Sequence, residues 1–247
     1  MCGRYALDAS VDEIASEFRV DPGSGEGWSA SWNIAPSRSA PVIRMREGRP
    51  RIDLLRWGLI PPWSREDMGG TGLFNARTET IDSKPSFRDS FRHQRCIVPL
   101  RAFYEWTGGK GRRRAFAIRA DDDRLFGLAG IWAGRNPDAD GSRESFSIVT
   151  RAAGPLLQSI HPRMPVVLHG PARDHWLDHR GVERGGPGPA ELKGILETAD
   201  DHGLCFHRVS NRVGSSAHEG SDLLQELSPE GDLDSLEEPG LFGPLDD

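Results

Sequence analysis

Apolar residues recur at helical spacing in five segments of the chain. In the clearest of these, which follows Ser10, the apolar positions i, i+3, i+4 and i+7 are Val11, Ile14, Ala15 and Phe18. Ser10 and Glu13 have the spacing of a capping box, in which each side chain accepts a hydrogen bond from the other residue's main-chain N–H. Related patterns predict helices at residues 84–96, 153–161, 172–178 and 189–198.

Short apolar or alternating runs bounded by turn residues predict β-strands in other parts of the chain. The clearest runs lie at residues 32–45, 51–60, 113–120, 125–134 and 144–152. Several strands follow one another without an intervening helix, so the regular βαβ alternation of a parallel sheet is missing. The pattern therefore predicts an α+β protein with a mostly antiparallel sheet.

The end of the chain differs in composition from the rest. From His218 onward there are ten acidic residues and no Lys or Arg, and Gly and Pro interrupt the sequence beyond Ser228. A segment of this kind has too little apolar surface to form a packed core. We therefore expect one domain over residues 1–227 and a disordered acidic tail over residues 228–247.

The formal net charge of −6 conceals a basic body. Setting those ten acids aside leaves 27 acids against all 31 Lys and Arg, so residues 1–217 carry a formal charge of about +4. Arg accounts for 28 of these bases, and its planar group suits bidentate contacts with phosphate. High-GC coding also replaces Lys with Arg, so the ratio alone identifies no partner. The sign of the charge is compatible with nucleic-acid binding.

Other features of the sequence restrict the class of protein. We find no apolar run long enough to span a membrane and no secretory signal, and we therefore expect a cytoplasmic protein without a membrane partner. The three cysteines, Cys2, Cys96 and Cys205, are too scattered for a disulfide framework or a Cys-x-x-Cys metal site. We expect Cys96 and Cys205 to be core residues.

Cys2 follows the initiator methionine directly and is followed by a glycine. Aminopeptidases remove Met before a small residue, so the mature chain would begin with the free amine and thiol of Cys2. An α-amine has a pKa of about 7.7–8.0, so part of it is unprotonated at pH 7. A modest electropositive setting would activate both groups. A 1,2-aminothiol reacts with an aldehyde to give an imine, which the sulfur closes to a thiazolidine. Chance placement of a cysteine at position two is the ordinary alternative.

Three more polar residues stand in informative surroundings. Asn75 lies among apolar residues, Glu105 is flanked by aromatic residues, and His161 precedes Pro162 at the end of a predicted helix. A carboxyl group buried among aromatics is expected to have a raised pKa. Each residue alone also has an ordinary explanation: a turn or cap for Asn75, an exposed strand edge for Glu105 and a helix C-cap for His161.

Eight motifs appear in order between Met1 and about Leu227. They are MCGR, WNIAP, RWGLIPPW, NARTET, FYEW, IVT, IHPRMPVVL and VSN followed by RV. Together they closely resemble the SOS-response-associated peptidase (SRAP) family, the abasic-site processing proteins of bacteria and eukaryotes. The resemblance implies a single domain with a barrel-like β core and flanking helices. It also implies removal of Met1 and a thiazolidine crosslink between Cys2 and abasic sites in single-stranded DNA.

The resemblance also assigns residues position by position. The catalytic set that it implies is Cys2, Asn75, Glu105 and His161. Arginines that match family positions near the DNA backbone are Arg4, Arg77 and Arg163. Further DNA-binding positions expected from the motifs are Asn33, Pro36, Trp63 and Thr150. Two departures stand out, since LRAFYEW replaces the usual acid-Gly turn and Pro162 stands where Asp is common. They affect the placement of Glu105 and the orientation of His161.

The expected activity is crosslinking in the DNA damage response, with Schiff-base chemistry like that of a lyase. We expect no cofactor, no metal and a monomer. The alternatives are an N-terminal-Cys amidotransferase that hydrolyses glutamine, a thiol peptidase as the family name suggests, and a non-catalytic DNA-binding module. A metal hydrolase is the least favoured.

Overall fold

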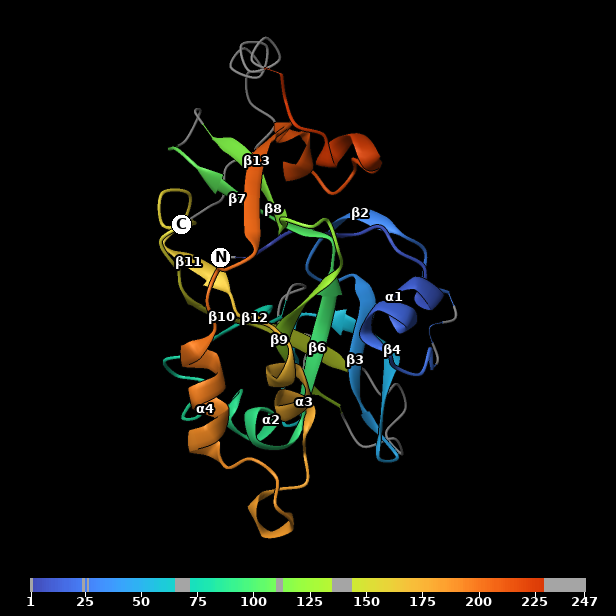
Figure 1. The fold of residues 1–247 in the computed structure, drawn as a ribbon, viewed down its shortest axis with the longest axis vertical. Helices are drawn as coiled ribbons and strands as arrows, with labels where there is room; N and C mark the ends of the chain where they lie inside the picture. The colour runs from blue at the N-terminus through green and yellow to red at the C-terminus, as the bar shows by residue number, and fades with distance from the viewer. Residues whose placement is uncertain are drawn as a thin grey trace.

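The computed structural model describes residues 2–23, 25, 27–64, 72–109, 113–134 and 144–228. Its strands form two sheets, which Figure 1 shows one above the other. The five-stranded sheet has the order β13 (Leu204–Val209), β8 (Arg114–Ala120), β7 (Ala102–Thr107), β1 (Tyr5–Leu7) and β2 (Ser31–Ile34). All of its pairings are antiparallel.

The eight-stranded sheet closes on itself. Its path runs through β11 (Arg163–Pro165), β10 (Ser145–Ala152), β4 (Arg49–Trp57), β3 (Ser39–Arg46), β6 (Arg95–Leu100), β9 (Phe126–Ala133) and β12 (Val167–Leu168). An additional pairing of β9 with β10 joins β10, β4, β3, β6 and β9 into a ring. The short strand β5 (Asn75–Arg77) pairs with β10. The α+β class with a barrel-like, mostly antiparallel core is therefore confirmed. The parallel exceptions are β10 with β4 and β10 with β5.

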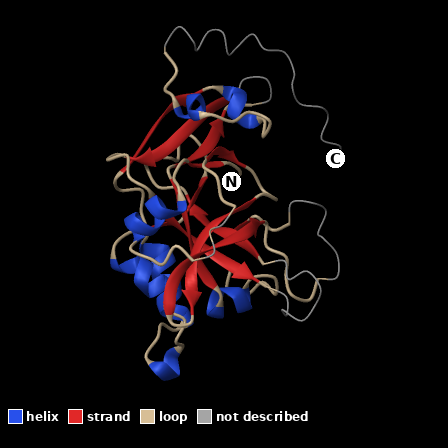
Figure 2. Ribbon diagram, turned by 90° about the vertical axis from the view of Figure 1, so that its right-hand side faces the viewer, coloured by secondary structure: helices blue, strands red, loops and turns tan. Residues whose placement is uncertain are grey.

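Helices flank the sheets at several places (Figure 2). The α-helices are α1 (Val11–Phe18), α2 (Arg88–His93), α3 (Pro171–Leu177) and α4 (Pro189–Thr198). Short 3-10 helices span Val182–Arg184, Asn211–Gly214 and Ser221–Leu224. The capping box predicted at α1 is present, with Ser10 N–H donating to Glu13 Oε2 at 2.7 Å and Glu13 N–H donating to Ser10 Oγ at 3.3 Å.

The helix predicted at residues 153–161 is absent, and a series of turns replaces it. Asp201 Oδ2 accepts a hydrogen bond from Leu156 N–H at 2.9 Å, and a Cβ on Gly154 would lie 2.4 Å from the same oxygen. Pro162 follows and cannot donate to a continuing helix. Two main-chain hydrogen bonds of helical spacing remain, from Gln158 N–H to the carbonyl of Gly154 and from His161 N–H to that of Leu157, but the turns do not join into a continuous helix.

Aromatic residues pack where the two sheets meet. Tyr5 of the five-stranded sheet and Trp57 of the eight-stranded sheet contact edge to face, with ring centroids 5.1 Å apart. Trp57 also stacks on Phe146 with a centroid distance of 6.3 Å. Both Tyr5 and Trp57 are fully buried. These contacts fix the orientation of the sheets, and the amino end of the chain lies between them in both views (Figures 1 and 2).

Candidate active site

Asn75 contacts Cys2 at the junction of the two sheets. Its Nδ2 donates a hydrogen bond to the main-chain carbonyl of Cys2 at 2.9 Å. Asn75 opens β5, where its parallel partner in β10 is Ile148. Trp57 holds the residue before this strand in place, because its indole N–H donates to the carbonyl of Phe74 at 2.9 Å. The other amide atom, Asn75 Oδ1, is buried and accepts no hydrogen bond from the described residues, so it remains available to a donor near Cys2.

Cys2 is fully buried just before β1. Burial raises the pKa of its thiol far above the usual value, and the negative charge of Glu105 raises it further. The positive amino terminus and a hydrogen bond with the main chain of Arg4 oppose this effect but do not overcome it. The electropositive setting considered from the sequence is therefore not what dominates here. The thiol is protonated at pH 7 and must lose its proton during the reaction.

Glu105 projects from the middle of β7 and is 4% exposed. Burial raises the pKa of its carboxyl group to about 7, against an ordinary value of 4.5. The nearby amino terminus and the main-chain N–H of Trp106 lower the pKa, but by less than burial raises it. The raised pKa expected from the aromatic surroundings is confirmed. A carboxyl group of this kind can both donate and accept a proton near neutral pH.

His161 is half-buried and lies two residues before the start of β11. Its Nδ1 is 3.0 Å from both the main-chain N and the carbonyl O of Arg163. An amide N–H only donates, so the hydrogen bond from Arg163 N–H leaves the proton of the neutral ring on Nε2. Burial lowers the pKa of His161, a hydrogen bond with the main chain of Arg163 raises it by less, and the positive charges of the amino terminus and Arg163 lower it further. The ring is therefore neutral at pH 7.

Four predicted catalytic residues converge on the amino end of the chain. Asn75 contacts Cys2 directly. The charge of the amino terminus acts on the pKa of the Cys2 thiol, Glu105 and His161 alike. Glu105 lies in the five-stranded sheet and Cys2 precedes its strand β1, whereas Asn75 lies in β5 of the eight-stranded sheet and His161 precedes β11 of that sheet. The site therefore exists only where the sheets pack together.

Arg163 makes an ion pair that the sequence motifs did not indicate. Its guanidinium donates to both carboxylate oxygens of Glu79, at 2.5 and 3.1 Å, and to the carbonyl of Thr150 at 2.7 Å. The hydrogen bonds from Arg163 lower the pKa of Glu79. Glu79 stands in the NARTET motif, but its partner is 84 residues away in sequence. Only the pairing of β10 with both β5 and β11 brings the two together.

The two other predicted arginines differ in their surroundings. Arg4 donates hydrogen bonds to the main-chain carbonyls of Gly3 and Gly214, both at 3.2 Å. Its pKa is lowered by burial. Arg77 ends β5 and is exposed. Both cations are close in sequence to catalytic positions, and phosphate is a suitable anion for them.

The remaining predicted DNA contacts fall into two groups. Asn33 is fully buried, and its Nδ2 donates to the carbonyls of Ser215 and His218 at 2.9 and 3.0 Å. Thr150 is fully buried and its Oγ1 accepts from Arg163 at 3.3 Å. Trp63 is 63% exposed, and Pro36 is half-buried. The structure thus gives Asn33 and Thr150 internal partners and leaves Trp63 open to a ligand.

The cysteines outside the site are free thiols. Cys96 is fully buried, as expected, whereas Cys205 is only half-buried on the edge strand β13. Within the described ranges, no group of three or more His, Cys, Asp or Glu side chains has the arrangement of a metal site. No helix among these residues is long and apolar enough to cross a membrane.

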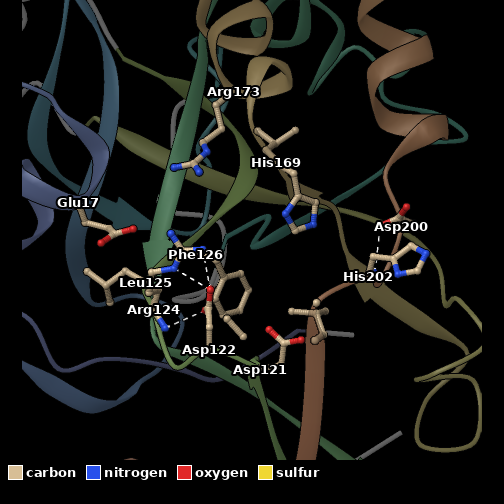
Figure 3. A pocket seen from close by; sticks show the side chains of 14 residues that line it. Glu17, Asp121, Asp122, Arg124, Leu125, Phe126, His169, Arg173, Asp200 and His202 are labelled. Carbon is tan, nitrogen blue, oxygen red and sulfur yellow. Dashed lines mark hydrogen bonds and ion pairs between the residues drawn. The ribbon is translucent and has the colours of Figure 1, made fainter.

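A cavity of about 470 Å³ lies away from the four catalytic candidates (Figure 3). None of those candidates lines it. Its charged side chains are those of Glu17, Asp121, Asp122, Asp200, Arg124 and Arg173. Arg124 is already paired with Asp122 at 2.6 Å. The excess of carboxylates makes this cavity a poor place for a DNA phosphate.

Comparison with known proteins identifies the family of the chain. The family model described as SOS response associated peptidase (SRAP) matches residues 1–216. The abasic site processing protein YoqW of Bacillus subtilis is 32% identical over 227 residues, which cover 91% of this chain and 99% of YoqW. The abasic site processing protein YedK of Escherichia coli is 29% identical over 237 residues, covering 92% of this chain and all of YedK.

Solved structures show the same fold. A crystal structure of a protein from Bacteroides thetaiotaomicron aligns with a TM-score of 0.78 at 23% identity, covering 92% of this chain and all of that one. The fold and the site define a protein with a buried cysteine, Cys2, at the junction of two β-sheets. The chain belongs to the SOS response associated peptidase (SRAP) family.

Proposed function

We propose that this protein recognises abasic sites in single-stranded DNA and, after removal of Met1, links Cys2 to the lesion through a thiazolidine ring. The observation that carries the proposal is the carboxyl group of Glu105, which has a pKa of about 7 and acts electrostatically on the Cys2 thiol. The names of the relatives YoqW and YedK, both abasic site processing proteins, support the choice of lesion.

The first step is opening of the abasic sugar, which is mostly a closed hemiacetal. Opening moves a proton from the C1′ hydroxyl to the ring oxygen and exposes the C1′ aldehyde. Glu105 is suited to this transfer because it is partly protonated near pH 7. Asn75 holds the Cys2 carbonyl, and its free Oδ1 can accept a hydrogen bond from the Cys2 amine. This places the nitrogen lone pair for attack on C1′.

The next steps form the ring with loss of one water. The amine adds to C1′, and the resulting carbinolamine loses its hydroxyl as water, taking a proton from Glu105. The product is an iminium ion beside a Glu105 carboxylate. That carboxylate accepts the thiol proton while the sulfur bonds to C1′ and the C=N electron pair returns to nitrogen. Because burial keeps the thiol protonated, ring closure follows imine formation. His161, neutral and with its proton on Nε2, assists these transfers.

The test is a denaturing gel with single-stranded DNA that carries one abasic site. Intact-mass analysis first establishes that the protein begins at Cys2. We expect a heat-stable shifted band from the wild type and from Cys205→Ala, and none from Cys2→Ala. Cys2→Ser retains the amine but forms no thiazolidine, so borohydride should trap a labile imine. DNA with a tetrahydrofuran in place of the abasic sugar has no aldehyde and should give no band.

Two outcomes would overturn the proposal. One is a Cys2→Ala protein that crosslinks at the wild-type rate. The other is the absence of a band from a protein that does begin at Cys2. In the second case the aminothiol serves a different electrophile, and glutamine hydrolysis becomes the next activity to measure.

A further inference from the structure

The strand register places an aromatic and cationic surface next to Glu105. Glu105 pairs with Phe116 in β8, and Phe116 pairs with Arg208 in β13. Residues directly opposite in an antiparallel pair have side chains on the same face of the sheet. The row Glu105–Phe116–Arg208 therefore runs outward from the active site across two strand spacings, about 10 Å.

A second row lies beside the first on the same face. Phe103 pairs with Ile118, which pairs with Phe206. Phe103 and Ile118 are fully buried in the main core, whereas Phe206 is 38% exposed at the open end of the row. Phe206 contacts Phe116 edge to face at a centroid distance of 5.8 Å. The guanidinium of Arg208 lies 5.8 Å from the ring centre of Phe116.

The opposite face of this sheet is covered by the chain itself. His207 points to that face, where its Nε2 lies 2.8 Å from the carbonyl of Leu224. Leu223 and Val213 of the C-terminal segment are buried there with Tyr104. Among the described residues, the C-terminal segment therefore covers the face opposite to Phe206 and leaves Phe206 exposed.

Charge also favours an anionic partner on the exposed face. Arg114 pairs with Thr107 at the end of β8 and is exposed, two residues before Phe116. Arg208 thus lies beside Phe116 on the neighbouring strand β13, and Arg114 lies two residues from Phe116 along β8. An aromatic platform next to arginines is the arrangement with which proteins hold single-stranded nucleic acid, because bases stack on the rings and phosphates contact the cations.

We propose that Phe116 and Phe206 form a stacking platform for the base of the nucleotide next to the lesion, with Arg208 and Arg114 at the adjoining phosphate. This inference rests on the proposed function, because it places the abasic sugar at Glu105. The platform begins one strand away from that residue and is continuous with the site. It gives the protein a contact with an intact base, which an abasic nucleotide itself does not offer.

The experiment measures crosslinking rates under single-turnover conditions with protein below saturation. The oligonucleotides differ only at the nucleotide next to the abasic site, which is adenine, thymine or a baseless tetrahydrofuran, placed on the 5′ or the 3′ side in turn. Stacking of one base is worth roughly 1–3 kcal/mol. We expect the wild type to favour adenine over the baseless neighbour by about 5- to 100-fold on one side of the lesion.

Variants connect this preference with the platform. Phe206→Ala should bring the ratio of the adenine rate to the baseless rate close to one, and Phe206→Leu, which retains apolar bulk without an aromatic face, should lower it as well. Val182→Ala changes another exposed apolar residue, 66% exposed and outside both sheets, and should keep the wild-type ratio. Thermal melts check that each variant is folded.

The outcomes separate the two proposals. A wild-type ratio near one on both sides, or an unchanged ratio in Phe206→Ala, would overturn the platform while leaving the crosslink intact. An equal loss with every neighbour would assign Phe206 to packing of the sheet edge and overturn it too. If the wild type crosslinks none of the oligonucleotides, the proposed function itself has failed.

Discussion

The side-chain amide of Asn75 donates to the main-chain carbonyl of Cys2 at 2.9 Å, and this bond connects the two sheets at the reactive end of the chain. The donor lies in β5 and the acceptor precedes β1. The main-chain position of Cys2 is therefore set by a residue 73 positions away in sequence.

Replacement of Asn75 should slow crosslinking without unfolding the protein. Asn75→Ala removes both the donor to Cys2 and the free acceptor, and Asn75→Asp removes the donor. We expect both to reduce the rate by about 10- to 100-fold, since small misplacements of reacting groups have effects of this size. The main-chain pairing of β5 with β10 does not depend on the amide, so thermal melts should change little. Wild-type rates in both variants would contradict the positioning role.

Glu105→Gln should abolish most of the activity. The amide cannot exchange a proton near neutral pH, and loss of general acid–base catalysis costs about 10²- to 10⁴-fold. The comparison is the single-turnover crosslinking rate at pH 7. A variant that retains the wild-type rate would exclude proton transfer by Glu105.

The same substitution should stabilise the protein in alkaline solution. The pKa of Glu105 is about 7 in the folded state against 4.5 ordinarily, so between these values the folded protein binds more protons than the unfolded chain. Stability contributed by this group is complete below about pH 4.5 and decreases as pH rises to 7. The loss is about 3.5 kcal/mol at most, from about 1.4 kcal/mol per pKa unit. Melting curves should therefore show Glu105→Gln several degrees above the wild type at pH 8, with little difference at pH 4.5.

Glu79→Gln should strengthen DNA binding. Glu79 is half-exposed and neutralises Arg163, which matches a DNA-binding position of the family. Removing its charge frees the guanidinium for phosphate and removes repulsion of the DNA. We expect several-fold tighter binding of tetrahydrofuran-containing DNA at 50 mM salt and a smaller effect at 200 mM, measured by fluorescence anisotropy. Weaker binding would mean that Glu79 holds Arg163 in the orientation that the ligand requires.

Deletion of residues 228–247 tests the role of the acidic tail, which lies outside the described residues beyond Ser228. The alignment with YoqW covers 99% of that protein but only 91% of this chain. A tail rich in acidic residues should compete with DNA for the arginines of the body. The truncated protein should bind single-stranded DNA more tightly at low salt. An unchanged affinity at 50 mM salt would contradict the competition.

Local chemistry made much of the fold predictable. The spacing of Val11, Ile14 and Phe18 with the Ser10–Glu13 capping box predicted α1 correctly. The same reasoning failed at residues 153–161, where the segment forms separate turns, is followed by Pro162 and has its Leu156 N–H bound to the distant Asp201. Periodicity detects local hydrogen bonding but not a partner supplied by a distant segment.

In the candidate site as well, features set by neighbouring residues were predictable, whereas features set by distant segments were not. The sequence predicted a raised pKa for a buried Glu105, and burial does raise it to about 7, although the adjacent Tyr104 and Trp106 point to the opposite face of the sheet. The Glu79–Arg163 ion pair and the parallel pairing of Asn75 with Ile148 depend on strands that meet only in the folded chain. The thiol of Cys2 shows the opposite trend from the one considered, because burial and Glu105 outweigh the positive amino terminus. The net shift of such a pKa depends on how deeply the thiol is buried and how far it lies from each charge, which only the folded structure gives.

The edge-to-face contact of Tyr5 with Trp57 joins the sheet that carries Glu105 to the sheet that carries Asn75. A cavity beneath either ring would let the sheets shift relative to one another by fractions of an ångström. The aminothiol would be chemically intact in such a protein, yet its proton-transfer partners would be displaced. Core mutations far from DNA should therefore appear in a screen as slow crosslinkers before they appear as unfolded proteins.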